Sequence, residues 1–413
     1  MTTGFPVVIF IKQENFSLYC FFLYYFLIIV YDITRRNLYT FGGKRMKKFP
    51  LILSLILILS LLAGCAGTPV VYYTNCTCPV DAHVETPAPA PTAAPEVAAT
   101  EAPVLAEGAL KTGLAISTSL KKSAAATAEA EGKADYDVTM VAVLVDDNGV
   151  IQSCIIDGIA SSVAFDATGA ITTDLTVAPQ TKNELGENYG MVAWGGAIAE
   201  WDAQAKALAD FAVGKTVEEL KTGAVSESGY APEGSDLASQ ATIYLGGYVY
   251  AIEAAVANAE HLGAQAGDIL KMATTTKIDS SAAATAEAAG NAQLNVDVVA
   301  LTMNGDIITS CYLDSVQAKV AFDATGAITS DVTAPVATKN ELGENYGMVA
   351  WGGAIAEWDA QAASFAAYVT GKTADEVAGI SITEATKPAD ADLAASVTIS
   401  VIGFMNLITK AAK

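Results

Sequence analysis

Apolar and polar positions along this chain follow patterns that occur twice. Two stretches, 136–145 and 296–303, are apolar at nearly every position, which is typical of strands covered on both faces. Each stretch is followed by an Asn-Gly pair, whose positive backbone dihedral angles favour a tight turn, and then by another apolar stretch. The pattern therefore predicts two antiparallel hairpins, over 136–156 and 296–313.

Helical patterns follow each hairpin. After a polar loop with several glycines, the first half has apolar residues spaced for one helical face, namely Ile198, Trp201, Ala205, Leu208 and Ala212. Thr216 and Thr373 each begin a Thr-x-x-Glu sequence, which has the spacing of a helix capping box. A long apolar segment, 243–259, closes the first half, and a counterpart closes the second. Strands first and helices afterwards indicate an α+β fold.

The two halves are copies of one unit. Residues 181–205 return letter for letter as 338–362, which lie 157 positions later. The segment 165–171 also recurs, and we interpret it as a turn between short strands. A period of this length is the size of a whole domain. We therefore predict two tandem homologous domains, copy 1 (108–262) and copy 2 (263–413), each with its own core.

The start of the chain has the features of an export signal. A basic Met-Lys-Lys at 46–48 precedes a short apolar run and a small-residue ending at Cys65. The ending Leu-Ala-Gly-Cys resembles a bacterial lipobox, which implies that the Cys65 thiol carries lipid and becomes the first mature residue. We interpret 46–64 as a signal peptide and 65–107, which is rich in Pro, Ala and Thr, as a disordered tether.

Residues 1–45 precede this signal and contain their own apolar, aromatic run at 16–30. Two membrane segments only a few residues apart, the second with its own Met-Lys-Lys start, make an uneconomical design. We interpret 1–45 as an upstream, non-native extension that the working protein lacks. The alternative is an additional membrane anchor.

Charge and composition exclude several function classes. Removing residues 1–64 leaves 16 basic and 43 acidic residues, a formal charge of −27, and removes all three arginines. Such a surface repels phosphate backbones, so we expect no nucleic-acid partner. Only His83 and His261 are present, which leaves no basis for histidine catalysis, and we predict no metal site. Cys154 and Cys311 occupy equivalent strand positions, where we expect buried small hydrophobic side chains.

One segment before the last helix of each copy is a candidate for cofactor attachment. Asp236-Leu-Ala-Ser-Gln-Ala-Thr242 resembles the Asp-x-x-Ser/Thr-Gly-Ala-Ser/Thr signature of the FMN-binding domain family. In that family a flavin transferase links FMN through its phosphate to the last hydroxyl. The resemblance implies that Thr242 carries covalent FMN, while Asp236 and Ser239 shape the turn. The corresponding segment from Asp392 to Thr398 places a second threonine at the same position.

Both copies depart from that signature. Its glycine is Gln240 in copy 1 and Ser396 in copy 2, which also has Ala395 and Val397 in place of the first hydroxyl and the alanine. Glycine allows a close approach of the backbone to phosphate that a side chain hinders. The alternative interpretation is that both copies kept the fold and lost the attachment, with the aspartates as helix N-caps and the threonines as helix-face residues.

Aromatic residues in the repeated block are candidates for a cofactor slot. Tyr189 and Trp194, with their counterparts Tyr346 and Trp351, lie in and beside a glycine-rich loop. Trp201 has helical spacing from the other apolar residues, so we interpret it as core.

These observations predict a lipoprotein anchored to the bacterial membrane outside the cytoplasm. By the resemblance, its two FMN-binding-like domains carry out flavin-dependent electron transfer, with a flavin transferase and a redox partner. The alternative is a non-redox binding or scaffold protein of the same fold, which holds its partner at the Trp194 and Trp351 loops. We identify no catalytic residue under either hypothesis.

Overall fold

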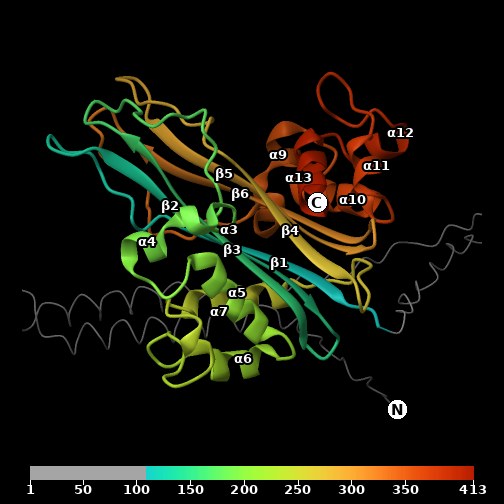
Figure 1. Cartoon of the computed structure of the whole chain (residues 1–413). Helices are drawn as coiled ribbons and strands as arrows, with labels where there is room; N and C mark the ends of the chain where they lie inside the picture. Colours follow the sequence, from blue (N-terminus) through green and yellow to red (C-terminus); the bar gives the residue numbers. More distant parts are fainter. Residues whose placement is uncertain (1–107) are drawn as a thin grey trace, which may run out of the picture. The chain divides into compact units, whose positions relative to one another are not determined.

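The computed structural model describes residues 108–413, and each copy in it is a three-stranded antiparallel sheet followed by helices (Figure 1). In copy 1 the strands, in spatial order, are β1 (Lys111–Ser119), β2 (Gly132–Val145) and β3 (Ile151–Phe165). In copy 2 they are β4 (Ile269–Lys277), β5 (Gly290–Asn304) and β6 (Ile307–Phe322). The predicted α+β class is confirmed.

The helices occur in the same order in both copies. Copy 1 contains α3 (Lys182–Leu185), η2 (Gly186–Tyr189), α4 (Met191–Gly195), α5 (Trp201–Ala212), α6 (Val217–Ala224), η3 (Leu237–Ser239) and α7 (Gly246–Ala257). Copy 2 contains α8 (Lys339–Leu342), η4 (Gly343–Tyr346), α9 (Met348–Gly352), α10 (Trp358–Val369), α11 (Ala374–Ala378), α12 (Ala391–Ala394) and α13 (Ile402–Ala412). Short helices and turns thus separate two longer helices that cover each sheet.

Local sequence signals explain most of these boundaries. The capping boxes at Thr216 and Thr373 are both formed. In each, the threonine hydroxyl accepts from the backbone N–H of the glutamate three residues later, and the carboxylate of that glutamate accepts from the backbone N–H of the threonine. Gly149 has φ +79° in the first hairpin turn, as the Asn-Gly pair predicted. The helix expected from residue 196 starts later, at Trp201, and Ile198 is largely exposed in the preceding loop.

Both faces of the central strands are buried, but against different partners. One face of β2 packs on the helices of copy 1 through Val141, Val143 and Val145. The other face packs on the sheet of copy 2, with alternate residues Tyr136, Val138, Met140, Ala142 and Leu144 in one apolar cluster with residues of β5 and β6. Figure 1 shows the helices of the two copies on opposite outer sides of the paired sheets.

The expected core of each copy accounts for only part of the buried apolar residues. Each copy has its own cluster between sheet and helices, and a third cluster is shared by both sheets. The physical reason lies in the strands: a sheet that is apolar on both faces needs a second cover. The helices cover one face, and the other copy's sheet covers the second.

Reciprocal hydrogen bonds join the two copies at the repeated 165–171 turn. The N–H of Ala126 donates to the carbonyl oxygen of Gly326 at 2.8 Å, and the N–H of Ala284 donates to that of Gly169 at the same distance. Because each bond is the counterpart of the other, the contact has the form of an isologous dimer interface inside one chain.

Several sequence-based interpretations concern residues outside the described part. The extension 1–45, the signal peptide 46–64 and the lipidated tether 65–107 all belong to it. Within 108–413, no helix is long and apolar enough to cross a membrane.

Candidate functional site

The Thr242 side chain lies at the surface, in the turn between η3 and α7. Its backbone N–H donates to Oε1 of Gln204 at 2.8 Å, and its hydroxyl donates more weakly to the same oxygen at 3.3 Å. Thr398 makes the same contacts with Gln361, at 2.8 and 3.2 Å, and is half-buried. The Thr242 residue is therefore exposed and Thr398 half-buried, and in both the hydroxyl points at the buried glutamine.

The glutamine beneath each threonine was not identified from the sequence. Gln204 is fully buried on α5, and its Nε2 donates to the carbonyl oxygen of Ala199 at 2.7 Å. Its Oε1 also accepts from the N–H of Ile243. Gln204 thus joins the loop before α5 to the threonine turn, and Gln361 does so in copy 2. A polar residue inside the apolar stripe of a helix was the available signal.

The two signature aspartates do not act as helix N-caps. Asp236 stands at the start of η3, but its carboxylate makes no capping bond; its carbonyl oxygen accepts from the N–H of Ser239 at 3.2 Å and from the Ser239 hydroxyl at 2.7 Å. In copy 2 the N-cap of α12 is Asp390, whose Oδ1 accepts from the N–H of Asp392 and of Leu393. The capping interpretation of Asp236 and Asp392 is therefore wrong, because Asp390, two positions earlier than Asp392, has the required geometry.

Trp194 projects into solvent from α4, with 91% of its surface exposed. The Glu200 carboxylate caps this short helix by accepting from the N–H of Met191 at 2.8 Å and of Val192 at 3.0 Å. The indole lies close to Gly190, where a Cβ would stand 2.3 Å from Cδ1 of the ring. The tryptophan is thus held outward by a capped turn.

The same projection exists in copy 2, where Trp351 is 90% exposed on α9 and Glu357 caps the helix. We call residues 190–198 and 347–355 the Trp knobs. Each knob also exposes a valine and an isoleucine, and none of its residues is charged. An exposed ring of this kind forms a slot only when another surface covers it.

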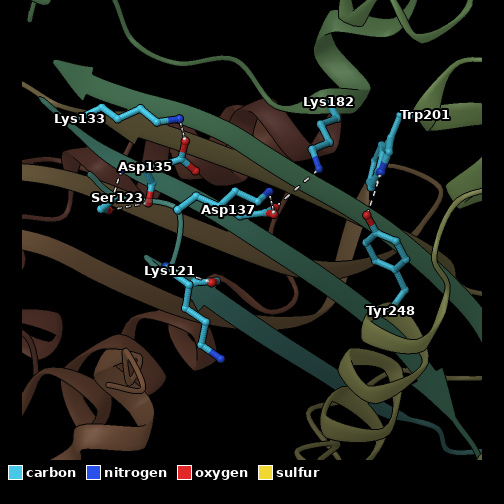
Figure 2. Close-up of polar contacts among 10 residues, drawn as sticks. Lys121, Ser123, Lys133, Asp135, Asp137, Lys182, Trp201 and Tyr248 are labelled. Atoms are coloured by element: carbon cyan, nitrogen blue, oxygen red, sulfur yellow. Dashed lines mark hydrogen bonds and ion pairs between the residues drawn. The ribbon is translucent and has the colours of Figure 1, made fainter. Parts of the chain in front are cut away.

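A buried lysine, Lys182, lies against the ring of Tyr189, the residue directly before the first knob. Lys182 Nζ is 4.9 Å from the ring centroid of Trp201 and 5.6 Å from that of Tyr189, so both rings contact the cation through their faces. Figure 2 shows Lys182 pointing toward Asp137, whose carboxylate is 3.8 Å away. Burial lowers the pKa of Lys182, and the attraction of Asp137 opposes that shift. Trp201 is buried, as predicted, and donates its indole N–H to the Tyr248 hydroxyl at 3.0 Å.

Copy 2 repeats this arrangement with another acid. Lys339 Nζ is 4.7 Å from the ring centroid of Trp358 and 5.3 Å from that of Tyr346, and burial lowers its pKa. The opposing negative charge comes from Asp297 on β5. Asn295 occupies the position that corresponds to Asp137 of β2, and Asp297 lies two residues further along β5 on the same face. The two tyrosines considered for a cofactor slot therefore cover a lysine in both copies.

A buried carboxylate stands beside each lysine turn. Asp157 Oδ1 accepts from the N–H of Gly158 at 2.7 Å and of Asn183 at 3.1 Å. Asp314 accepts from Ser315 and Asn340 in the same way. Burial raises the pKa of Asp157, and it raises that of Asp314 to about 6. These bonds tie each β-edge to the helix that follows.

Cys154 and Cys311 are free thiols, and burial raises the pKa of each to about 12. At that pKa the reactive thiolate is scarce at neutral pH. Among residues 108–413 no group of three or more His, Cys, Asp or Glu side chains is placed to hold a metal ion. Compared with protein-family models, curated proteins and solved structures, the chain has no match in any of the three.

Proposed function

We propose that the chain is an extracytoplasmic lipoprotein, anchored through Cys65, whose folded part binds a partner through the two Trp knobs. The exposure of Trp194 and Trp351 is the observation that carries this proposal. Burying one large apolar side chain contributes about 1.5–3 kcal/mol. Both tryptophans are exposed on capped turns, so the isolated chain does not gain this free energy of burial. A complex that covers them would gain it.

Duplication strengthens such binding. Two equivalent knobs on one chain turn the second contact into an intramolecular event, provided that the partner reaches both. The knobs carry no charge, whereas the folded part as a whole is acidic. The contact is therefore apolar, and the surrounding acidic surface disfavours polyanionic partners.

Oxidation of tryptophan in intact cells tests this proposal. N-bromosuccinimide should modify Trp194 and Trp351 in the purified chain, and both should be protected in cells that display it. The buried Trp201 serves as an internal control, and the exposed Tyr250, which lies outside the knobs, as a second one under hydroxyl-radical labelling. The tryptic peptides of the two knobs differ in mass, because Lys206 ends the first one and has no basic counterpart in copy 2. Equal labelling in cells and in solution would refute the proposal.

The anchor needs a separate measurement. We expect the mature N-terminal peptide to begin at Cys65 and to carry acyl mass. A Cys65→Ser variant should be released from the membrane while it keeps its fold. An unmodified Cys65 in membrane-bound protein would contradict the anchor without affecting the knobs.

A second candidate function is flavin carriage, which the exposed position of Thr242 favours. The hydroxyl of Thr242, Thr398 or both would attack the diphosphate of FAD with a flavin transferase as catalyst, so that the P–O–P bond breaks, AMP leaves with the proton, and FMN stays as a phosphodiester. A membrane redox partner would then exchange electrons with the flavin. A covalent bond needs no arginine clamp, which an arginine-free surface cannot offer. Coexpression of the full chain with a flavin transferase should add the mass of FMN less one water to a peptide containing one of these threonines. Unmodified peptides would exclude this function.

A further inference from the structure

Copy 1 has an exposed pair of tyrosine rings close to Thr242 in the sequence. Tyr244 and Tyr230 are about half exposed, and their rings meet edge to face at a centroid distance of 5.6 Å. Tyr244 lies directly on the backbone of two glycines. A Cβ at Gly229 would stand 2.2 Å from its ring, and one at Gly246 would stand 2.8 Å from its hydroxyl.

The backbone beneath this pair is fixed. The N–H groups of Leu245 and Gly246 both donate to the carbonyl oxygen of Gly229, at 2.8 and 3.0 Å. The turn that carries Tyr230 is closed by a bond from the N–H of Ser226 to the Tyr230 carbonyl oxygen at 2.8 Å. The rings are therefore preorganised, which lowers the entropy lost when a flat ligand stacks on them.

Copy 2 shows that the fold does not need these rings. Its backbone follows the same path, since the N–H of Val401 donates to the carbonyl oxygen of Thr386 as that of Leu245 does to Gly229. Ser400 takes the place of Tyr244, and its hydroxyl bonds to that of Thr386 at 2.6 Å. Lys387 takes the place of Tyr230. The aromatic pair is thus a property of copy 1 alone.

Charge around the pair narrows the class of ligand. Segment 226–246 contains Glu227, Glu233 and Asp236 and no basic residue. A free phosphate ligand would meet only negative charge there, whereas an uncharged ring meets no such repulsion.

We propose that Tyr244 and Tyr230, whose ring planes meet at 87°, form a platform in which one ring stacks on a neutral, planar fused ring of the isoalloxazine type and the other borders it. For flavin, this proposal rests on the second candidate function. It adds that only copy 1 has a site for the flavin ring beside its threonine, Thr242, whereas Thr398 of copy 2 has no such site. The platform also binds the free ring, because the rings are in place before any covalent attachment.

Titration of the purified full chain with riboflavin tests the platform. We expect saturable quenching of riboflavin fluorescence at one site per chain. Tyr244→Ser, which copies the residue of copy 2, should weaken binding by about 10-fold or more. Tyr250→Ser removes another exposed tyrosine of α7 and should leave binding unchanged. Free FMN should bind more weakly than riboflavin, and the difference should shrink as salt screens the phosphate.

A gain of binding provides the complementary test. The triple substitution Thr386→Gly, Lys387→Tyr and Ser400→Tyr rebuilds the platform in copy 2 and should raise the stoichiometry from one site to two. No saturable binding, equal binding by the Tyr244→Ser variant, or tighter binding of FMN than of riboflavin would each overturn the platform.

These results separate the platform from flavin carriage. FMN mass on Thr242, with flavin fluorescence unchanged by Tyr244→Ser, would overturn the platform and leave carriage standing. Saturable riboflavin binding by a chain that never gains covalent FMN would support the platform and exclude flavin carriage. FMN mass on Thr398 alone would overturn the asymmetry.

Discussion

The rings of Phe165 and Phe322 stack face to face, with an interplanar angle of 2° and a centroid distance of 4.0 Å. They are the same residue of the two copies, and both are fully buried in the cluster shared by the two sheets. A residue that meets its own counterpart marks the axis of an isologous contact. The chain is therefore built as a fused dimer, in which each copy completes the core of the other.

The first prediction concerns this stack. Phe165→Ala should lower the free energy of unfolding by about 3–5 kcal/mol, since it empties a large buried site. The loss should reach both copies, because the shared core couples them. Hydrogen exchange followed by mass spectrometry can measure the protection of β2 and β5 separately. Reduced protection in copy 1 alone would contradict the coupling, and Trp194→Ala, at the surface, serves as the control.

A second prediction compares two glycines that both have a positive φ and that differ in the space around them. Gly326 has φ +72°, and a Cβ there would stand 2.5 Å from the Ala126 Cβ and 2.7 Å from the Asp166 carbonyl oxygen. Gly149 has φ +79° with nothing within 4 Å. Gly149→Ala should cost only the backbone term, about 1 kcal/mol. Gly326→Ala should cost more than that by about 1–3 kcal/mol, because the two turns must separate.

Denaturant titration of both variants measures the difference. Equal losses would show that the turns of the two copies do not press on each other. The test also addresses why the 165–171 segment recurs unchanged: its glycine faces the other copy, so both copies are under the same steric constraint.

Local signals in the sequence predicted the local structure well. The Asn-Gly hairpins and the Thr-x-x-Glu caps depend on neighbouring residues, and both formed as expected. Strand β1, Lys111–Ser119, was missed because its glycine, serines and threonines dilute the apolar pattern. What covers the second strand face could not be predicted either, since periodicity reports that a face is buried and not by what.

The candidate site was only partly predictable. The threonine turn was found through a motif, but its support by Gln204 depends on a contact 38 residues away in sequence. Glu200 caps the short helix that carries the exposed Trp194, and no spacing pattern in the sequence predicts this cap. Tertiary contacts of this kind override local propensity.

A third prediction concerns that glutamine. Gln204→Met keeps the volume and removes the acceptor of the Thr242 and Ile243 N–H groups, so it should lower stability by about 1–3 kcal/mol. Amide exchange at Thr242 and Ile243 should also accelerate. Lys206→Met, on the exposed side of the same helix, breaks only a surface ion pair with Asp210 and should cost less than about 0.5 kcal/mol. Unchanged exchange at Thr242 in Gln204→Met would refute the role assigned to Gln204.

A fourth prediction follows from the buried carboxylate of Asp314. Its folded-state pKa is about 6, above the ordinary 3.8, because burial disfavours the charged form. A raised folded pKa contributes stability that is fully present below pH 3.8 and is lost as the pH rises through 6. Linkage puts this contribution at about 3 kcal/mol. The free energy of unfolding should therefore fall by most of this amount, from this group, between pH 4 and pH 7.

Asp314→Asn isolates that contribution, because the amide oxygen can still accept from the N–H groups of Ser315 and Asn340 while the group no longer titrates. Near pH 4 the buried group is neutral in both chains, so the variant should be about as stable as the parent chain. As the pH approaches 7 the parent chain loses stability and the variant does not, so the variant should become the more stable of the two. Asp306→Asn, which removes an exposed carboxylate of the same copy, is the matched control. If the difference between Asp314→Asn and the parent chain stayed constant from pH 4 to pH 7, Asp314 would have to titrate at its ordinary pKa, and the folded environment would not hold it protonated.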